Sequence, residues 1–147
     1  MAGPGDPGLI TVRGLEVLAR AEVVLYDALA HPALLAACSH AQLFDVGKRY
    51  GSESPGPSVE DREARQDVLN QRMNAVARAG KRVVRLKGGD PLLFARGAEE
   101  ASALADAGVE FEVVPGVPSP VGVSAYAGIS LTHRDLSSSV TFITGSD

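Results

Sequence analysis

The sequence predicts an α/β fold in which parallel strands alternate with helices. Short runs rich in β-branched residues alternate with segments of helical spacing along the chain. The runs EVVLY and RVVRL lack strict alternation of polar and apolar residues, as expected of strands that are covered on both faces. The chain has 147 residues, which suffices for one domain with its own core.

Five strands are predicted, each from an apolar run bounded by turn residues: residues 22–26, 42–46, 82–86, 111–114 and 140–144. Four helices are predicted from capping residues and helical spacing. The first covers residues 12–21 with Thr11 or a neighbour as its cap, the second residues 59–79 between Ser58 and Gly80, the third opens at Asp90 and Pro91 and ends at Gly108, and the fourth runs from Pro118 or Ser119 to Tyr126. Residues 51–57 (GSESPGP) predict a loop.

Composition excludes several classes of protein. The net charge is −4 and there is no tryptophan, which argues against a nucleic-acid partner. The N-terminus lacks the basic and apolar regions of a signal peptide. The most apolar long window, residues 21–38, contains Glu22, Asp27 and Pro32, which argues against a membrane span. We expect a cytoplasmic protein.

Metal and nucleophile motifs are not found. Cys38 is the single cysteine, which excludes a disulfide framework and a cysteine-based zinc cluster, and we expect it to be a buried helix residue. His31, His40 and His133 have no metal-ligand spacing with carboxylates, so no metal is predicted. No serine–histidine–aspartate pattern is present.

Eight of the fourteen basic residues fall between Arg62 and Lys87. Most of them lie on the predicted helix of residues 59–79, interspersed with acidic residues. This pattern is typical of a solvated helix face of mixed charge.

Candidate site residues follow the predicted strands. Asp27 follows the first strand, GKR the second, KGGDP the third and PGVPS the fourth. Because ligands bind at the carboxyl ends of the strands of an open parallel sheet, these residues predict a site at one edge of the sheet. The presence of these residues at one edge of the sheet does not identify the ligand.

Two glycine motifs allow alternative interpretations. Residues 3–8 (GPGDPG) match the dinucleotide pattern G-x-G-x-x-G, but Pro4 and Pro7 remove two backbone donors and no strand precedes the motif, which disfavours that interpretation. In KGGDP, two glycines allow a ligand close to the backbone. Asp90 could equally be a plain helix cap with Pro91 in the first turn.

Six sequence motifs follow one another along the chain, in this order: AGPGDPGLIT, EVVLYDAL, VGKRYG, GKRVVRLKGGDPLLFARGAEE, VVPGV and AYAGISLTHRDLSSSVTFITG. Together they cover nearly the whole chain. The chain resembles the uroporphyrinogen-III C-methyltransferases of the tetrapyrrole methylase family. AGPGDPG and RLKGGDP, followed by YAGISLTHR, are its most specific blocks.

The resemblance implies a homodimer of two-domain α/β subunits with S-adenosyl-L-methionine in the cleft, released as S-adenosyl-L-homocysteine. It implies transfer of methyl groups to C2 and C7 of uroporphyrinogen III, giving precorrin-2 on the way to sirohaem and cobalamin. The partner is then a small tetrapyrrole, with neither a nucleic acid nor a membrane. A methylase acting on a later precorrin and an inactive module that does not bind cofactor alone are the alternatives.

The resemblance also implies roles for individual residues. Asp27 matches the proposed proton acceptor and Lys48 the proposed proton donor. The positions that match cofactor-binding residues are Pro4, Gly88, Gly89, Asp90, Leu93, Pro118 and Ser119.

The expected chemistry suits these residues. Methyl transfer is an in-line displacement that depends mostly on positioning, and the electron-rich pyrrole carbon needs no protein nucleophile. A carboxylate such as Asp27 could take the proton that later leaves the ring, or it could be a plain solvated residue at a strand end. Lys48 could donate a proton or attract carboxylates. The substrate has eight carboxylates, so we expect a basic rim from Lys48, Arg49, Lys87, Arg96 and Arg134.

The sequence departs from the family pattern in several places. Pro118 replaces the usual threonine, which removes a hydroxyl and a backbone donor. The segment between Tyr50 and Gly80 is several residues longer than usual. The family's first strand and second domain have no counterpart here, so we expect residues 1–139 to be its N-terminal α/β domain and residues 140–147 the start of the next domain. We expect weak or no activity from this chain alone.

Overall fold

The computed structural model describes residues 2–47 and 58–145, which form a three-stranded sheet with helices around it. In their spatial order the strands are β2 (Gln42–Asp45), β1 (Val23–Tyr26) and β3 (Val83–Leu86). Both outer strands run parallel to β1, and Val23 pairs with Gln42 on one side and Val83 on the other. The prediction of a parallel α/β fold with these three strands is confirmed.

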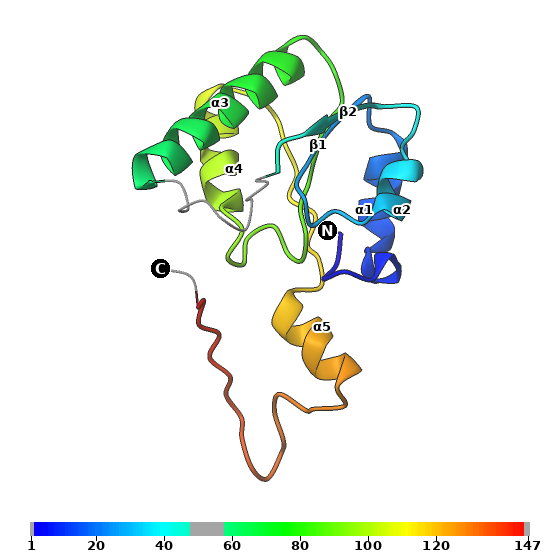
Figure 1. Cartoon of the computed structure of the whole chain (residues 1–147), viewed down its shortest axis with the longest axis vertical. Coiled ribbons are helices and arrows are strands. Elements are labelled where there is room, and N and C mark those ends of the chain that lie inside the picture. The colour runs from blue at the N-terminus through cyan, green and yellow to red at the C-terminus, as the bar shows by residue number, and fades with distance from the viewer. Residues whose placement is uncertain (1, 48–57, 146–147) are drawn as a thin grey trace.

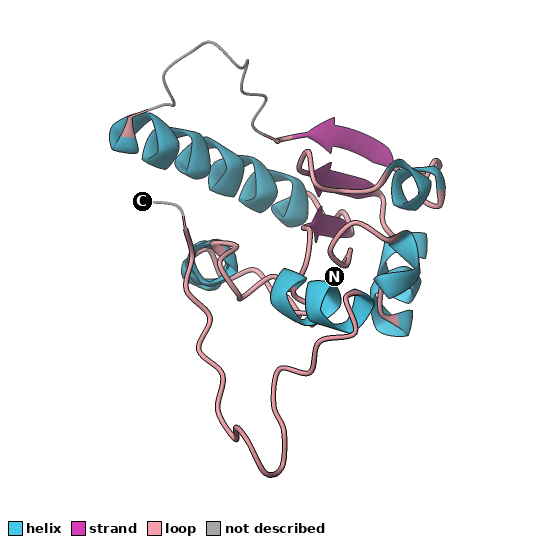
Figure 2. Ribbon diagram, turned by 60° about the horizontal axis from the view of Figure 1, so that its bottom comes forward, coloured by secondary structure: helices cyan, strands magenta, loops and turns pink. Residues whose placement is uncertain are grey.

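The helices lie on both sides of the sheet. They are the 3₁₀ turn η1 (Pro7–Leu9) and the α-helices α1 (Val12–Ala19), α2 (Pro32–Ala36), α3 (Val59–Arg78), α4 (Gly97–Asp106) and α5 (Ser119–Tyr126). The long α3 lies on one side of the sheet, and α1 and α2 lie on the other (Figures 1 and 2). This arrangement buries the central strand β1 on both faces, as its unbroken apolar run predicts, whereas the edge strand β2 is mostly exposed.

The predicted helix ends are set by side-chain caps. Thr11 Oγ1 accepts the Gly14 N–H at 3.1 Å at the start of α1. Ser58 and Asp61 form a reciprocal capping box at the start of α3, and Gly80 follows its end with a φ of 78°. Helix α2 was not predicted. Its sequence signal is His31, whose Nδ1 accepts the Ala33 N–H at 3.1 Å just before a proline in the first turn.

The core lies between β1, α1 and α2. Leu18, Val24 and Leu86 are fully buried in it. Cys38 is also buried, in the turn that follows α2, and burial raises the pKa of its thiol. The prediction that Cys38 is buried is therefore confirmed, although it lies just after a helix.

Two predicted strands are wrong. Residues 111–114 form no ladder, and they are held by the buried Val114 and by an ion pair of 2.8 Å between Arg13 and Glu112. Residues 140–144 are extended but pair with no strand in the described part of the chain, and the Ile143 side chain is exposed. Both runs have strand composition, but a strand needs a backbone partner as well.

The helix predicted from Asp90 begins later, at Gly97. Phe94 and Arg96 have φ values of 53° and 54°, in the left-handed region that a right-handed helix excludes. Asp90 therefore caps a turn before the helix, where its Oδ1 accepts the Leu92 N–H at 2.9 Å. The prediction that α5 opens at Pro118 or Ser119 is confirmed, because Pro118 is its N-cap.

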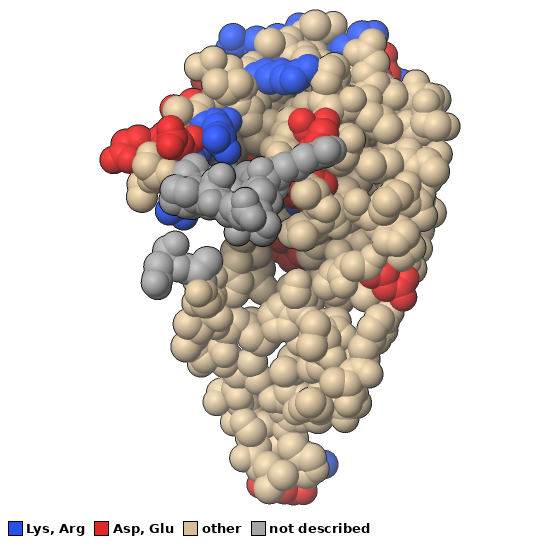
Figure 3. Space-filling model, viewed as in Figure 1, with Lys and Arg blue, Asp and Glu red and all other residues tan. Residues whose placement is uncertain are grey.

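Charged residues are unevenly distributed over the molecule. Figure 3 shows basic and acidic side chains over the part that contains α3, whereas the part below, formed by α5 and the residues after it, carries charges mainly at its tip. Residues 127–145 form a projecting segment that runs away from the sheet after α5, turns at the bottom of the view and runs back up (Figure 1). Among the described residues no helix is both long and apolar enough to cross a bilayer.

Candidate functional site

A cavity of about 1150 Å³ opens at the carboxyl ends of the strands. Its walls come from the N-terminal loop, the ends of β1 and β3, the loop after β3, one face of α3, and the first turn of α5. It contains eight of the predicted site residues: Pro4, Asp27, Gly88, Gly89, Asp90, Leu93, Pro118 and Ser119. Lys48, the ninth, lies outside the described residues, as do Arg49 and the predicted loop of residues 51–57.

The N-terminal loop is fixed to the segment that follows β3. The Ala2 N–H donates to the Lys87 carbonyl at 3.0 Å, and the Gly89 N–H donates to the Gly3 carbonyl at 3.0 Å. Pro4 rests on α5 at Gly122, where an added Cβ would stand 2.4 Å from the Pro4 Cγ. The two glycine motifs are therefore brought side by side at one end of the cavity.

A side-chain hydrogen bond also ties this loop to α5. The Tyr126 hydroxyl donates to Asp6 Oδ2 at 2.6 Å, and Asp6 Oδ1 accepts the Gly8 N–H at 2.7 Å. The bond from Tyr126 lowers the pKa of the Asp6 carboxyl, and the same bond raises the pKa of the Tyr126 phenol. The bond thus joins two segments that are 120 residues apart in the chain.

The glycines of the loop after β3 are required by close approaches. A Cβ on Gly88 would lie 3.0 Å from the Leu29 Cβ, and Gly89 has a φ of 63°. A side chain at either position would be crowded or strained. At Gly88 and Gly89 no side chain therefore separates the backbone of this loop from the cavity.

Asp90 acts as a clamp between two loops. Its Oδ2 accepts the Gly116 N–H at 3.0 Å, in addition to the bond from Leu92. The alternative that Asp90 is a plain helix cap is wrong, because α4 begins at Gly97. A carboxylate has about four acceptor positions, so the two backbone bonds leave capacity for a ligand donor.

A buried ionic network lies beneath the cavity. Lys87 Nζ donates to Glu100 Oε1 at 2.8 Å, and both residues are 5% exposed. Arg85 Nε donates to the same oxygen at 3.3 Å, and another of its nitrogens lies 3.6 Å from Asp27 Oδ2. Burial and the neighbouring Arg85 lower the pKa of Lys87, against the opposite effect of Glu100. Arg85 therefore links the network to Asp27, whose Oδ1 accepts the Leu29 N–H at 3.1 Å.

The expected basic rim needs correction at three positions. Lys87 is buried against Glu100 and cannot reach a ligand as a free cation. Arg96 is paired with Glu99. Arg134 lies on the projecting segment and is not among the residues that line the cavity. The charge pattern alone could not separate a buried lysine from an exposed one.

The sequence reasoning missed residues that line the cavity. Arg62, Arg65 and Arg72 lie on the face of α3 that borders it, although the mixed charge of that helix predicted a purely solvated face. Phe94 also borders the cavity, with its side chain 59% exposed and its backbone left-handed. A signal for the arginines is their spacing of three and seven residues, which places them on one helix face.

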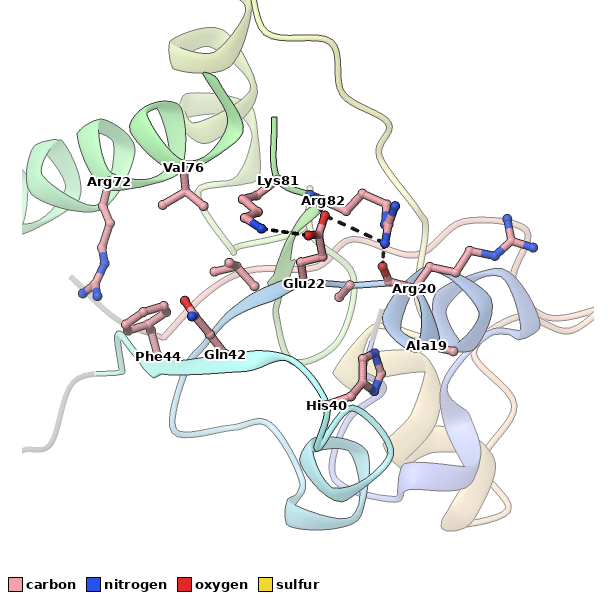
Figure 4. Close-up of a pocket in the computed structure, with 12 residues that line it drawn as sticks. Ala19, Arg20, Glu22, His40, Gln42, Phe44, Arg72, Val76, Lys81 and Arg82 are labelled. Atoms are coloured by element: carbon pink, nitrogen blue, oxygen red, sulfur yellow. Dashed lines mark hydrogen bonds and ion pairs between the residues drawn. The ribbon is translucent and has the colours of Figure 1, made fainter. Parts of the chain in front are cut away.

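A second cavity, of about 890 Å³, lies at the opposite, amino ends of the strands. Figure 4 shows Glu22 facing Lys81 and Arg82 there. The Arg82 backbone N–H and Lys81 lower the pKa of Glu22. Arg72 lies over the Phe44 ring at 3.8 Å at the end of this cavity nearest α3. Of the predicted site residues that the structure describes, none lines this second cavity. In the described part of the chain, no group of three or more His, Cys, Asp or Glu side chains is placed to hold a metal ion.

Comparison with known proteins identifies the family. The model of the tetrapyrrole (corrin/porphyrin) methylases matches residues 2–147. The chain belongs to this family. The siroheme synthase 1 of Yersinia enterocolitica is 53% identical over 145 residues, which is 98% of this chain and 29% of that protein. The chain thus spans less than a third of the length of this relative.

Solved structures of the family share the fold. Uroporphyrin-III C-methyltransferase from Thermus thermophilus is 46% identical with a TM-score of 0.72, and the match covers 90% of this chain and 52% of that one. A structure of the Thermus thermophilus enzyme complexed with S-adenosyl homocysteine is 40% identical, with a TM-score of 0.66 and coverage of 92% and 52%. A cobalt precorrin-4 methyltransferase is 36% identical, with a TM-score of 0.71 and coverage of 92% and 51%.

Proposed function

We propose that this chain provides the S-adenosylmethionine site of a methyltransferase that methylates uroporphyrinogen III at C2 and C7, giving precorrin-2. The observation that carries the proposal is that one cavity at the strand ends gathers the residues expected to bind cofactor and the carboxylate Asp27. Relatives named siroheme synthase and uroporphyrin-III C-methyltransferase support it.

The residues around the cavity fit S-adenosylmethionine. The bare backbone at Gly88 and Gly89 allows a flat or extended group to lie close to the chain. Leu93 supplies an apolar contact, and Ser119 and Asp90 supply polar atoms for the hydroxyl and amino groups of the cofactor. A cavity of about 1150 Å³ is large enough for the cofactor and part of a substrate.

The chain's part in the reaction is to position and to accept a proton. When bound, the cofactor supplies an electrophilic methyl group on a sulfonium. The electron pair of the pyrrole carbon forms the new carbon–carbon bond, and the electrons of the broken carbon–sulfur bond stay on sulfur. We assign Asp27 to accept the proton that then leaves the ring, because it lines the cavity and is oriented by Leu29 and Arg85.

Lys48 is proposed as the proton donor on the strength of the resemblance alone. A homodimer and a cytoplasmic location are proposals on the same ground. The prediction that residues 140–147 begin a second domain also stands as a proposal, since the matched relatives are longer than this chain.

A single-turnover assay tests the function. The chain, in excess over uroporphyrinogen III, is supplied with S-adenosylmethionine carrying a labelled methyl group, and the product is weighed by mass spectrometry. We expect a slow gain of one and then two labelled methyl groups. We expect Asp27→Asn to lower the rate by about 100-fold or more, the usual contribution of a general base, with little change in cofactor affinity.

The control for Asp27→Asn is Asp106→Asn, an acidic substitution at the end of α4 and away from the cavity lining. Equal rates for the two variants would contradict the role of Asp27. Label transfer no faster than in buffer, together with no binding of S-adenosylhomocysteine in calorimetry, would favour the alternative of an inactive module that does not bind cofactor alone.

A methylase acting on a later precorrin is the second candidate, favoured by the similarity to cobalt precorrin-4 methyltransferase. The identity to the uroporphyrin-III C-methyltransferase is higher, at 46% against 36%. The same labelled assay, run with a precorrin in place of uroporphyrinogen III, separates the two. Turnover of the precorrin alone would overturn the first choice.

A further inference from the structure

Three arginines of α3 border the cavity on the same face of the helix. Arg62, Arg65 and Arg72 are spaced by three and seven residues, which places them in one stripe along α3. We call them the arginine stripe. The arginine stripe lines the cavity from α3, whereas the strand ends and the glycine loop line it from other elements. The cavity therefore has a cationic lining that is separate from the residues expected to bind the cofactor.

The acidic side chains of the cavity do not neutralise the arginine stripe. Among the described residues that line the cavity, six are Arg or Lys and four are Asp or Glu, although the chain carries a net charge of −4. The four acidic groups have partners of their own: Asp61 caps α3, Asp90 clamps two loops, Asp27 bonds Leu29 N–H and Glu100 holds Lys87. The cavity lining therefore has more cationic than anionic side chains, whereas the whole chain has a negative net charge.

The guanidinium groups of the stripe are available to an anion. Arg62 Nε donates only a long bond of 3.4 Å to the Ser58 carbonyl, and Arg72 lies over the face of Phe44. Within the described part of the chain none of the three is held in an ion pair with a carboxylate. A guanidinium presents donors in a fork that matches a carboxylate, so these groups suit carboxylates better than lysines would.

Apolar side chains lie between the cations. Leu69 belongs to the same helix face, Val68 is 65% exposed beside it, and Phe94 is 59% exposed on the loop before α4. Exposed apolar groups flanked by arginines match a macrocycle of pyrrole rings with carboxylates on its rim. An anion without an apolar body, such as phosphate, would use only half of this surface.

We propose that the arginine stripe binds carboxylate side chains of the tetrapyrrole substrate and thereby selects tetrapyrroles with many carboxylates. The inference rests on the proposed function, because it takes the substrate to be a tetrapyrrole. It adds to the proposed function the residues that bind the carboxylates at the edge of the macrocycle. Arg62, Arg65 and Arg72 are substrate-binding residues and take no part in bond making.

Fluorescence titration with uroporphyrin III tests the proposal. This stable porphyrin carries the same eight carboxylates as the reduced substrate, and coproporphyrin III, with four, is the comparison ligand. We expect each of Arg62→Gln, Arg65→Gln and Arg72→Gln to weaken uroporphyrin binding by about two- to fivefold, the usual range for an exposed charge pair, and the triple variant by more than tenfold. The loss for coproporphyrin should be smaller.

Two controls separate charge from folding. Arg20→Gln removes the same charge at the opposite ends of the strands, and it should leave uroporphyrin affinity unchanged. Arg65→Lys keeps the charge but not the forked donors, and it should lose less affinity than Arg65→Gln. Binding to the wild-type chain should also weaken with added salt more steeply than binding to the triple variant, since fewer ion contacts remain in the variant.

Titration of the same proteins with S-adenosylhomocysteine separates the two claims. We expect the triple variant to bind it as the wild-type chain does. Uroporphyrin binding that is equal in the triple variant and in Arg20→Gln, or absent from a wild-type chain that binds S-adenosylhomocysteine, would overturn the arginine stripe. Arginine-dependent uroporphyrin binding without any S-adenosylhomocysteine binding would support the stripe and contradict the proposed cofactor site.

Discussion

At the residue scale, the N-terminal loop can pack against α5 because Gly122 has no side chain. An added Cβ there would stand 2.4 Å from the Pro4 Cγ, well inside van der Waals contact. Pro4 is rigid and cannot turn its ring away as a flexible side chain could. The position of Pro4 over the cavity therefore depends on a glycine in another element.

We predict that Gly122→Ala shifts Pro4 and weakens binding of S-adenosylhomocysteine by about tenfold, the equivalent of a small overpacking penalty. Calorimetry on the two proteins measures the difference. Gly145→Ala is the matched control, because an added Cβ there meets nothing within 4 Å. An affinity that the Gly122 variant shares with the control would show that the contact with Pro4 does not position the loop.

The buried pair of Lys87 and Glu100 makes a second residue-scale prediction. Glu100→Leu leaves the Lys87 ammonium buried beside Arg85 without its partner, and we expect a loss of about 3–5 kcal/mol in the free energy of unfolding. Lys87→Met combined with Glu100→Leu should restore most of that loss, because no unpaired charge remains. Urea unfolding of both variants tests this. A double variant as unstable as the single one would mean that the pair's packing, not its charge, matters.

At the element scale, the bond between Asp6 and Tyr126 connects the N-terminal loop with α5. The folded state lowers the pKa of Asp6, so the bond stabilises the chain above the ordinary carboxyl pKa of 3.8 and this contribution is lost as the pH falls through the lowered value. The folded state raises the pKa of Tyr126, so on the alkaline side the contribution is present below 10.0 and is lost as the pH rises through the raised value.

We predict that Tyr126→Phe lowers the melting temperature at pH 7, and that the gap to the wild-type chain narrows at both acid and alkaline pH. Thermal melts at several pH values measure the gap. Tyr26→Phe serves as the comparison, since Tyr26 lies in β1 and away from Asp6. A gap that stays constant across the pH range would remove the ionic character assigned to the bond.

The sequence predicted correctly those helix ends that are set by residues next to them in the chain. Ser58, Thr11 and Gly80 set helix ends through their own side chains or backbone, so their roles could be read from the sequence. Residues 111–114 have strand composition but no ladder partner, which composition cannot reveal. The late start of α4 depends on left-handed Phe94 and Arg96, residues with no local preference for that conformation.

The candidate site could be predicted to the extent that its motifs are contiguous. Pro4 and the KGGDP segment carry the family pattern, and the fold brings them together. The arginine stripe escaped prediction because a helix of mixed charge shows no preferred face until another element lies against it. Lys87 was misplaced because its partner, Glu100, lies thirteen residues away on another element.

At the scale of the whole molecule, the described residues divide into a charged part around the sheet and a part with few charges from α5 onward (Figure 3). The part with few charges exposes the apolar side chains of Val123, Tyr126, Ile129, Leu136 and Ile143. Exposed apolar surface of this kind is typical of an interaction surface. The cavity opens beside it, between the N-terminal loop, α5 and α3. We infer that this cavity, at the carboxyl ends of the strands, binds the cofactor.

Nuclear magnetic resonance with S-adenosylhomocysteine tests that claim most directly. The chain is 15.2 kDa, so its backbone amide signals can be assigned and followed during a titration that also detects weak binding. We predict that the signals of Gly3, Gly88, Gly89, Asp90 and Ser119 move and saturate together. Signals that do not move, or that move instead at Arg20, His40 and Lys81 around the opposite cavity of Figure 4, would contradict the account.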